Sequence, residues 1–277
     1  MYIECRGSGS PAVVLVAGQR GSAAEWSLTE SRTDPPSPAV FGEVARFTRV
    51  CAYDRPGTPV GESFSRSDPA PQPTTAGSAT ADLHALLRSA GQGAPYVLVG
   101  HSAGGTVARL YASTHPDEVR GMALVDALAE GLQDAMTPAQ WTIQRILLEG
   151  DLTESLREYP DIERFDADAT FAQLRAAPPL RPMPLVVLSS DASIGQLVKD
   201  LAASGQLPAG VPADFGYVTE AAQVASQAGL AALVPGARHV RDTNSGHNIH
   251  REQPQLVVAA IRDVVDAVRQ GRATLAP

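Results

Sequence analysis

The sequence predicts an α/β fold, with a central, mostly parallel β-sheet flanked by helices. Short apolar runs alternate with helical stretches along most of the chain, which is the order expected of βαβ units. Runs such as Ala12–Val16 are apolar at every position, as in strands buried on both faces. With 277 residues, 44% of them hydrophobic, the chain can bury a sizeable core.

The first half of the chain is expected to supply four strands, the first beginning almost at Met1. The other three are predicted at Ala12–Val16, Thr48–Tyr53 and Tyr96–Val99. A polar, proline-rich loop runs from about Thr58 to Pro73. Helices are expected between the strands, at Ala39–Phe47, from a cap at Thr74 or Thr75 through Leu87, and at Thr106–Ala112.

The second half is expected to add strands at Gly121–Asp126, Pro184–Ser189 and Arg238–Arg241. Two stretches without strand signals, 127–182 and 192–235, are predicted to be helical insertions, and the first of them is expected to form a cap. Thr137 and Gln140 begin one of its helices as a capping-box pair. An amphipathic helix closes the chain, and residues 1–277 are expected to form a single domain because strands on both sides of the insertions complete one sheet.

The motif Gly100-His101-Ser102-Ala103-Gly104-Gly105 lies between a predicted strand and a predicted helix. A serine at such a turn has strained backbone geometry and needs very small neighbours. The turn exposes its hydroxyl beside a helix N-terminus, where unpaired N–H groups favour a developing negative charge. Ser102 is therefore the predicted nucleophile, whereas an ordinary tight turn is the alternative explanation of the glycines.

A serine nucleophile needs a base, and the base needs a carboxylate to orient it. His247 is the predicted base because it lies in a loop after the last strand. Asp126 is the preferred acid because it ends the strand that follows the Ser102 helix, and the carboxyl ends of parallel strands are where ligands bind. Asp191 and Asp242 remain alternatives.

The developing oxyanion needs two backbone donors. The N–H of Ala103, directly after the nucleophile, is the first candidate. The second is the N–H of Gln19, in the loop after the strand Ala12–Val16. A flexible turn is the alternative interpretation of this glycine-containing loop.

Composition limits the classes of partner. The formal net charge of −8 argues against nucleic acid, and no basic patch is evident for membranes. Since no signal peptide or bilayer-spanning run is visible, a soluble protein is expected, cytoplasmic or exported after loss of a leader. No metal or cofactor is called for, because there is no Cys/His cluster or phosphate-binding glycine loop.

Taken together, several motifs resemble the α/β-hydrolase fold superfamily in its esterase-like branch, over nearly the whole chain. They are Gly7–Pro11, Val13–Gly18, Tyr53–Gly57, Gly100–Gly105, Arg120–Asp126, and Ser245–His247 with Gln253-Pro254. The resemblance implies a sheet of about eight strands with a helical cap after the sixth. By motif, Ser102 matches the nucleophile of the family and His247 its histidine.

The resemblance also bears on the acid and on the cysteines. Family members place the acid after the sixth or seventh strand, commonly three residues after a glycine in the latter case. Here Ser190 and Ser193 occupy those two places and Asp191 is out of register, which favours Asp126. Cys5 and Cys51 lie in predicted strands and are small buried hydrophobes or a disulfide; the resemblance implies that their strands are adjacent.

The chemistry expected of these residues is hydrolysis of a carboxylic ester or lactone through an acyl-enzyme. Serine argues against the epoxide hydrolases and dehalogenases of this fold, which the resemblance implies use aspartate. Amide, thioester or carbon–carbon bond substrates remain alternatives because the triad chemistry is similar. A ligand-binding protein without turnover is the alternative from another class, since fold alone does not settle function.

Overall fold

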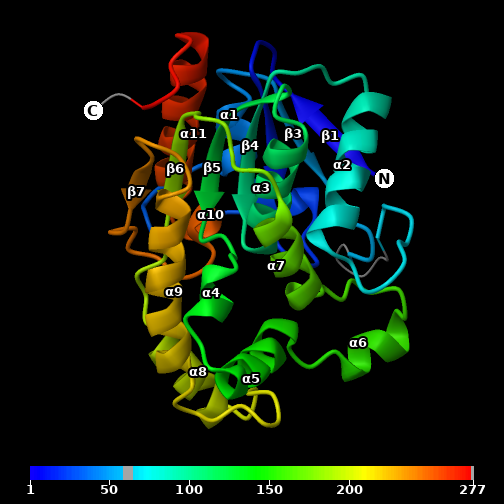
Figure 1. Ribbon diagram of the computed structural model, residues 1–277, viewed down its shortest axis with the longest axis vertical. Helices are drawn as coiled ribbons and strands as arrows, with labels where there is room; N and C mark the ends of the chain where they lie inside the picture. Colours follow the sequence, from blue (N-terminus) through cyan, green and yellow to red (C-terminus); the bar gives the residue numbers. More distant parts are fainter. Residues whose placement is uncertain (59–64, 276–277) are drawn as a thin grey trace.

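The computed structural model describes residues 1–58 and 65–275, which form one seven-stranded sheet between layers of helices (Figure 1). The strand order is β1-β3-β2-β4-β5-β6-β7. β1 pairs antiparallel with β3, and the other pairs are parallel. The strands are β1 (Ile3–Arg6), β2 (Ala12–Val16), β3 (Val50–Tyr53), β4 (Tyr96–His101), β5 (Val119–Val125), β6 (Leu185–Leu188) and β7 (Arg238–Val240). The mostly parallel sheet is confirmed, with seven strands in the described residues where the resemblance implied about eight.

Alternate residues of the central strands enter two separate apolar cores. In β2, Val13 and Leu15 pack with helices α1 (Val40–Val44) and α11 (Pro254–Arg269). Val14 and Val16 pack on the opposite face, which is covered by α2 (Ala76–Ser89), α3 (Ala103–Thr114) and α9 (Gly216–Ala231), in front of the sheet in Figure 1. Burial on both sides explains why β2 is apolar at every position.

The segment between β5 and β6 contains four helices: α4 (Gly131–Asp134), α5 (Pro138–Glu149), α6 (Thr153–Glu158) and α7 (Ala167–Ala176). Thr137 caps α5 with Gln140 as its capping-box partner, as predicted. This segment follows the fifth described strand, not the sixth, because one strand fewer precedes it than the resemblance implied. α5 lies beyond the end of the sheet toward which β5 points (Figure 1).

The segment between β6 and β7 contains α8 (Ile194–Ala203) and α9. Two further short helices are η1 (Ala23–Ser27), which follows β2, and α10 (Ile249–Glu252), which follows β7. Part of the predicted loop from Thr58 to Pro73, residues 59–64, lies outside the described residues. Among the described helices, none is long and apolar enough to cross a membrane.

The two cysteines face each other across the edge of the sheet. Cys5 in β1 is opposite Cys51 in β3, and the two form a disulfide. The implied adjacency of their strands is thus confirmed, and the disulfide alternative is the one the structure contains.

Candidate active site

Ser102 lies at a sharp turn between β4 and α3, in a backbone conformation that residues other than glycine rarely adopt (φ 52°, ψ −127°). The turn depends on the glycines on either side. A Cβ on Gly100 would lie 2.6 Å from the Cα of Gly105, and one on Gly104 would lie 2.3 Å from the carbonyl oxygen of Val16. Because α3 begins at Ala103, the N–H of that residue has no acceptor within the helix.

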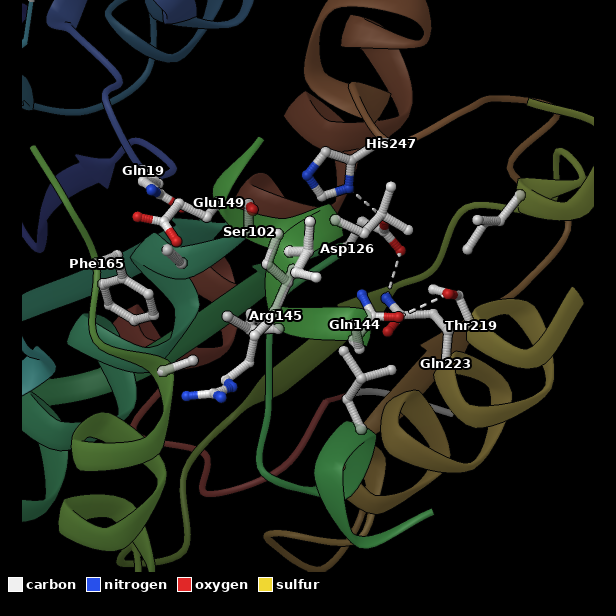
Figure 2. Close-up of a pocket in the computed structure, with 18 of the residues that line it drawn as sticks. Gln19, Ser102, Asp126, Gln144, Arg145, Glu149, Phe165, Thr219, Gln223 and His247 are labelled. Carbon is white, nitrogen blue, oxygen red and sulfur yellow. Dashed lines mark hydrogen bonds and ion pairs between the residues drawn. The ribbon is translucent and has the colours of Figure 1, made fainter. Parts of the chain in front are cut away.

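Asp126, directly after β5, and His247, in the loop after β7, are brought together by the fold. The Nδ1 atom of His247 lies 2.6 Å from Oδ2 of Asp126 (Figure 2). The aspartate side chain is 3% exposed and that of the histidine 50%. A buried carboxylate on Nδ1 fixes the imidazole orientation and leaves Nε2 free for other chemistry.

Two residues that the sequence analysis did not assign to the site hold the other oxygen of Asp126. The backbone N–H and hydroxyl of Ser190 donate to Oδ1 at 3.0 and 3.1 Å, and the amide of Gln223 donates to it at 3.4 Å. In the sequence, Ser190 is distinguished only as a departure from the family pattern. Gln223 comes from α9, and Figure 2 shows it directed at Asp126.

Asp191, one of the alternative acids, binds the backbone of the loop before His247. Its carboxylate accepts from the N–H groups of Asn244 and Ser245, each at 2.9 Å. Burial acts to raise the pKa of Asp191, but these N–H groups outweigh it and hold the pKa below its usual value. Asp242, the other alternative, is exposed. The fold therefore places Asp126 against His247 and gives Asp191 a loop-shaping contact.

The loop after β2 lies against Ser102. A Cβ on Gly18 would lie 3.0 Å from the Cβ of Ser102, so the chain passes the serine very closely. Gln19 is the next residue, and it lines the same cavity as Ser102 and Ala103. The two predicted oxyanion donors are thus both at the cavity that holds the serine.

A cavity of about 1100 Å³ opens over Ser102, Asp126 and His247. Its walls come from the loop after β2 and from both helical segments (Figure 2). Apolar side chains from α4, α5 and α8 contribute much of the surface, among them Leu132, Leu147 and Leu197. Gln144 of α5 adds a polar group and accepts a hydrogen bond from Thr219 of α9 at 2.6 Å.

Two further histidines pack behind His247. His101 of β4 donates from Nε2 to the carbonyl oxygen of His247 at 3.0 Å. The centroid of its ring lies 4.3 Å from the ring centroid of His250. Burial lowers the pKa of His101 well below its usual value and that of His250 to about 3. Both rings are therefore neutral near pH 7, and they support the His247 loop without adding charge.

One grouping of metal-ligand-type side chains occurs in the described part of the chain, away from this cavity. It consists of His84, His115 and Glu118. The two imidazoles stack face to face, with centroids 4.1 Å apart and planes 16° from parallel. Stacked rings do not direct their in-plane nitrogens at a common ion, and Glu118 already accepts from the Tyr111 hydroxyl and contacts His84.

Comparison with known proteins gives relatives over most of the chain. The uncharacterized protein YqjL of Bacillus subtilis is 26% identical over 98% of this chain and 89% of its own length. An uncharacterized protein of Schizosaccharomyces pombe is 33% identical, but the match covers 46% of this chain and only 26% of that protein. The pimeloyl-[acyl-carrier protein] methyl ester esterase of Chromobacterium violaceum is 28% identical over 64% of this chain and 62% of its own length.

Solved structures share the fold at low sequence identity. A thermophilic esterase from Thermogutta terrifontis aligns with a TM-score of 0.53 and 22% identity, covering 97% of this chain and 93% of that one. The enol-lactonase from Burkholderia xenovorans LB400 aligns with a TM-score of 0.52 and 18% identity, covering 96% of each chain. The model of the alpha/beta hydrolase family matches residues 13–260. The chain belongs to the alpha/beta hydrolase family.

Proposed function

We propose that this protein is a serine hydrolase that cleaves a carboxylic ester or lactone through an acyl-enzyme. The observation that carries the proposal is the 2.6 Å contact between His247 and the buried carboxylate of Asp126, at the cavity that also contains Ser102. Acyl transfer requires a nucleophile, a base and an orienting acid, and the three residues here follow different strands of the sheet.

In the first step, Oγ of Ser102 attacks the carbonyl carbon of the substrate while Nε2 of His247 accepts the hydroxyl proton. The carboxylate of Asp126 stabilises the imidazolium that forms. The carbonyl oxygen becomes an anion, which the backbone N–H groups of Gln19 and Ala103 stabilise. Loss of one such donor raises a barrier of this kind by about 2.7–4 kcal/mol.

The tetrahedral intermediate then collapses. The bond between the carbonyl carbon and the ester oxygen breaks, and His247 gives its proton to the departing alkoxide, which leaves as the alcohol. Water next attacks the acyl carbon on Ser102 while His247 again accepts a proton. The bond between that carbon and Oγ of Ser102 then breaks, His247 returns the proton to Oγ, and the free carboxylic acid leaves. A lactone follows the same steps, with the alcohol and acid groups remaining in one molecule.

The shape of the cavity supports an ester whose acyl or alkyl part is apolar. Leucines of α4, α5 and α8 line the space above Ser102, and a volume of about 1100 Å³ accommodates more than an acetyl group. The C. violaceum relative is named for its action on a methyl ester of an acyl chain. That similarity supports an ester over an amide.

The direct test is labelling with a fluorophosphonate, which reacts with activated serines, followed by assay of a panel of p-nitrophenyl esters and lactones. We expect wild-type protein to be labelled and to hydrolyse several esters, and Ser102→Ala to lose both properties. A tryptic digest of the labelled protein should place the adduct on Ser102.

Adding amides and thioesters to the panel separates the alternatives. Hydrolysis of amides or thioesters in preference to esters would assign the triad to a different leaving group. An unlabelled Ser102, with no turnover of any ester, lactone, amide or thioester, would refute the proposal and favour a ligand-binding protein on this fold.

A further inference from the structure

Glu163 is a buried carboxylate that is not part of the proposed triad. It belongs to the segment between α6 and α7, and its side chain is 1% exposed. It forms an ion pair with Arg55, the residue two positions after β3, whose side chain is also 1% exposed. Burial acts to raise the pKa of Glu163, but the Arg55 guanidinium outweighs it and keeps the carboxylate ionised near pH 7.

The second oxygen of Glu163 contacts the loop after β2. Oε2 accepts the backbone N–H of Arg20 at 2.7 Å. Arg20 directly follows Gln19, the proposed oxyanion donor, and has a positive φ of 57°. A non-glycine residue in that conformation needs support from its surroundings. The carboxylate of Glu163 provides such support at the peptide next to the donor.

Glu163 is itself held by residues outside the helical insertion between β5 and β6. Its backbone N–H donates to the carbonyl oxygen of Gly57 at 2.9 Å, and its Oε1 accepts from the Thr74 hydroxyl at 2.9 Å. Arg20 also contacts the insertion through its side chain, which donates to the carbonyl oxygen of Glu149 at the end of α5 at 2.9 Å. Two separate contacts, one to Glu163 and one to Glu149, therefore join the loop after β2 to the helical insertion between β5 and β6.

From these contacts we infer that Glu163 is a positioning residue, which fixes the Gln19 N–H at the oxyanion by holding the N–H of Arg20. The inference rests on the proposed function, since it assigns Glu163 a part in the same acyl transfer. The ion pair with Arg55 serves to hold the carboxylate in place, and the acceptor oxygen at Arg20 carries the catalytic effect.

The expected consequence follows from the geometry of oxyanion stabilisation. The donor must lie at hydrogen-bond distance from the position that the anion will occupy, and displacement of a catalytic group by about 1 Å can lower the rate about 100-fold. Because this contact matters mainly in the transition state, its loss lowers kcat with little change in KM.

Two double variants separate the acceptor from the ion pair. In the first, the amide variant, Arg55→Met is combined with Glu163→Gln, which removes both charges but keeps an amide oxygen for Arg20. In the second, the thioether variant, Arg55→Met is combined with Glu163→Met, which removes the charges and the acceptor at similar side-chain volume. Replacing a buried ion pair by apolar groups of similar volume is often close to neutral for stability, and the amide of Glu163→Gln keeps hydrogen-bond partners at Arg20 and Thr74, so we expect both proteins to fold.

We expect the amide variant to keep kcat for p-nitrophenyl butyrate within about threefold of wild type, and the thioether variant to lose about 10- to 100-fold with KM little changed. The affinity for a trifluoromethyl ketone, which forms a tetrahedral adduct with serine, should fall in proportion to kcat/KM. Equal kcat values in the two double variants, whether high or low, would overturn the inference.

Glu130→Gln is the matched control. Glu130 pairs with Arg109 through two hydrogen bonds of 2.7 Å. Among the described residues, neither of the two forms a hydrogen bond or ion pair with the loop after β2. This variant should change the melting temperature but not kcat. A kcat loss there equal to that of the thioether variant would assign the effect to general loosening and overturn the inference.

If a double variant does not fold, Glu163→Asp gives the same test. Aspartate keeps the charge beside Arg55, but its shorter side chain draws the oxygen away from Arg20. We expect a lower kcat with a melting temperature near that of wild type, and an unchanged kcat would overturn the inference. Failure of the proposed function is distinguishable, because then wild-type protein would hydrolyse no ester and Ser102 would remain unlabelled.

Discussion

Ser102 and Asp126 both have positive φ angles, 52° and 40°, which side chains with a Cβ seldom adopt. Each follows a parallel strand of the central sheet, and each is held by its neighbours. The N–H of Ser102 donates to the carbonyl oxygen of Val125, and the N–H of Asp126 donates to the carbonyl oxygen of Leu188. A strained backbone conformation that is held by hydrogen bonds to adjacent strands is typical of residues at functional sites.

At this scale the roles of the two candidate acids can be separated. Asp126→Asn should lower kcat about 10³- to 10⁴-fold, because an amide at this position favours the wrong tautomer of His247. Asp191→Asn keeps one oxygen acceptor for the loop N–H groups and should lower kcat less than about tenfold. Steady-state kinetics on one p-nitrophenyl ester measures both. The reverse order of losses would show that Asp191 is the acid.

The candidate site residues that could be predicted are those with a local signal. Ser102 lies in a glycine motif, and His247 and Asp126 follow strands that are recognisable from their composition. Ser190, Gln223 and Glu163 have no such signal. Gln223 contacts a carboxylate 97 residues away, and Glu163 contacts Arg20 across 143 residues. From the sequence alone, a polar side chain in a helical or loop segment is expected to be exposed, because a hydrogen-bond partner so distant in sequence is known only from the fold.

At the scale of elements, prediction was best where a strand is buried on both faces. β2, with the bounds Ala12–Val16, was predicted without error because no polar residue interrupts it. β5 begins at Val119, two residues before its predicted start, since the exposed Arg120 within it has the character of a loop. The helices η1, α4, α6 and α10 are five, four, six and four residues long. Such lengths are too short for helical periodicity to show.

The burial of His250, where α10 packs against β4, makes the free energy of unfolding depend on pH. His250 of α10 is 1% exposed, and its ring lies against Trp26 and His101. Its pKa falls to about 3 in the folded protein, mainly through burial, so the unfolded chain binds the proton more readily. A histidine with a lowered pKa stabilises the fold fully above its unfolded pKa of about 6.5, and this contribution is lost as the pH falls from there toward the folded value.

We therefore expect the free energy of unfolding to decrease between pH 8 and pH 5, with His250 accounting for about 2 kcal/mol of the decrease. His250→Phe removes the titrating group but keeps an aromatic ring beside Trp26. Urea unfolding of both proteins at several pH values provides the measurement, and the variant should show the smaller pH dependence. Parallel curves for the two proteins would contradict the assignment to His250.

At the scale of the whole molecule, the sheet carries its proposed chemistry and its covalent link at different places. Ser102 and Asp126 follow β4 and β5, in the middle of the strand order, whereas Cys5 and Cys51 join β1 and β3 at one edge. β1 has only four residues, and within the described residues it pairs with β3 alone. Such a short edge strand has few hydrogen bonds of its own, so the disulfide is well placed to keep it on the sheet.

The disulfide spans 46 residues, and closing a loop of that length restricts the unfolded chain by about 4 kcal/mol on a chain-entropy model. Cys5→Ala with Cys51→Ala should therefore lower the melting temperature by about 10 °C. Ester hydrolysis at 25 °C should stay near the wild-type rate, because the substituted strands do not carry the triad. Reducing agent should bring the wild-type melting temperature toward that of the variant and leave the variant unchanged. If reduction does not affect the wild type and the variant melts at the same temperature, then the fold holds β1 by packing alone and the cross-link contributes little to its stability.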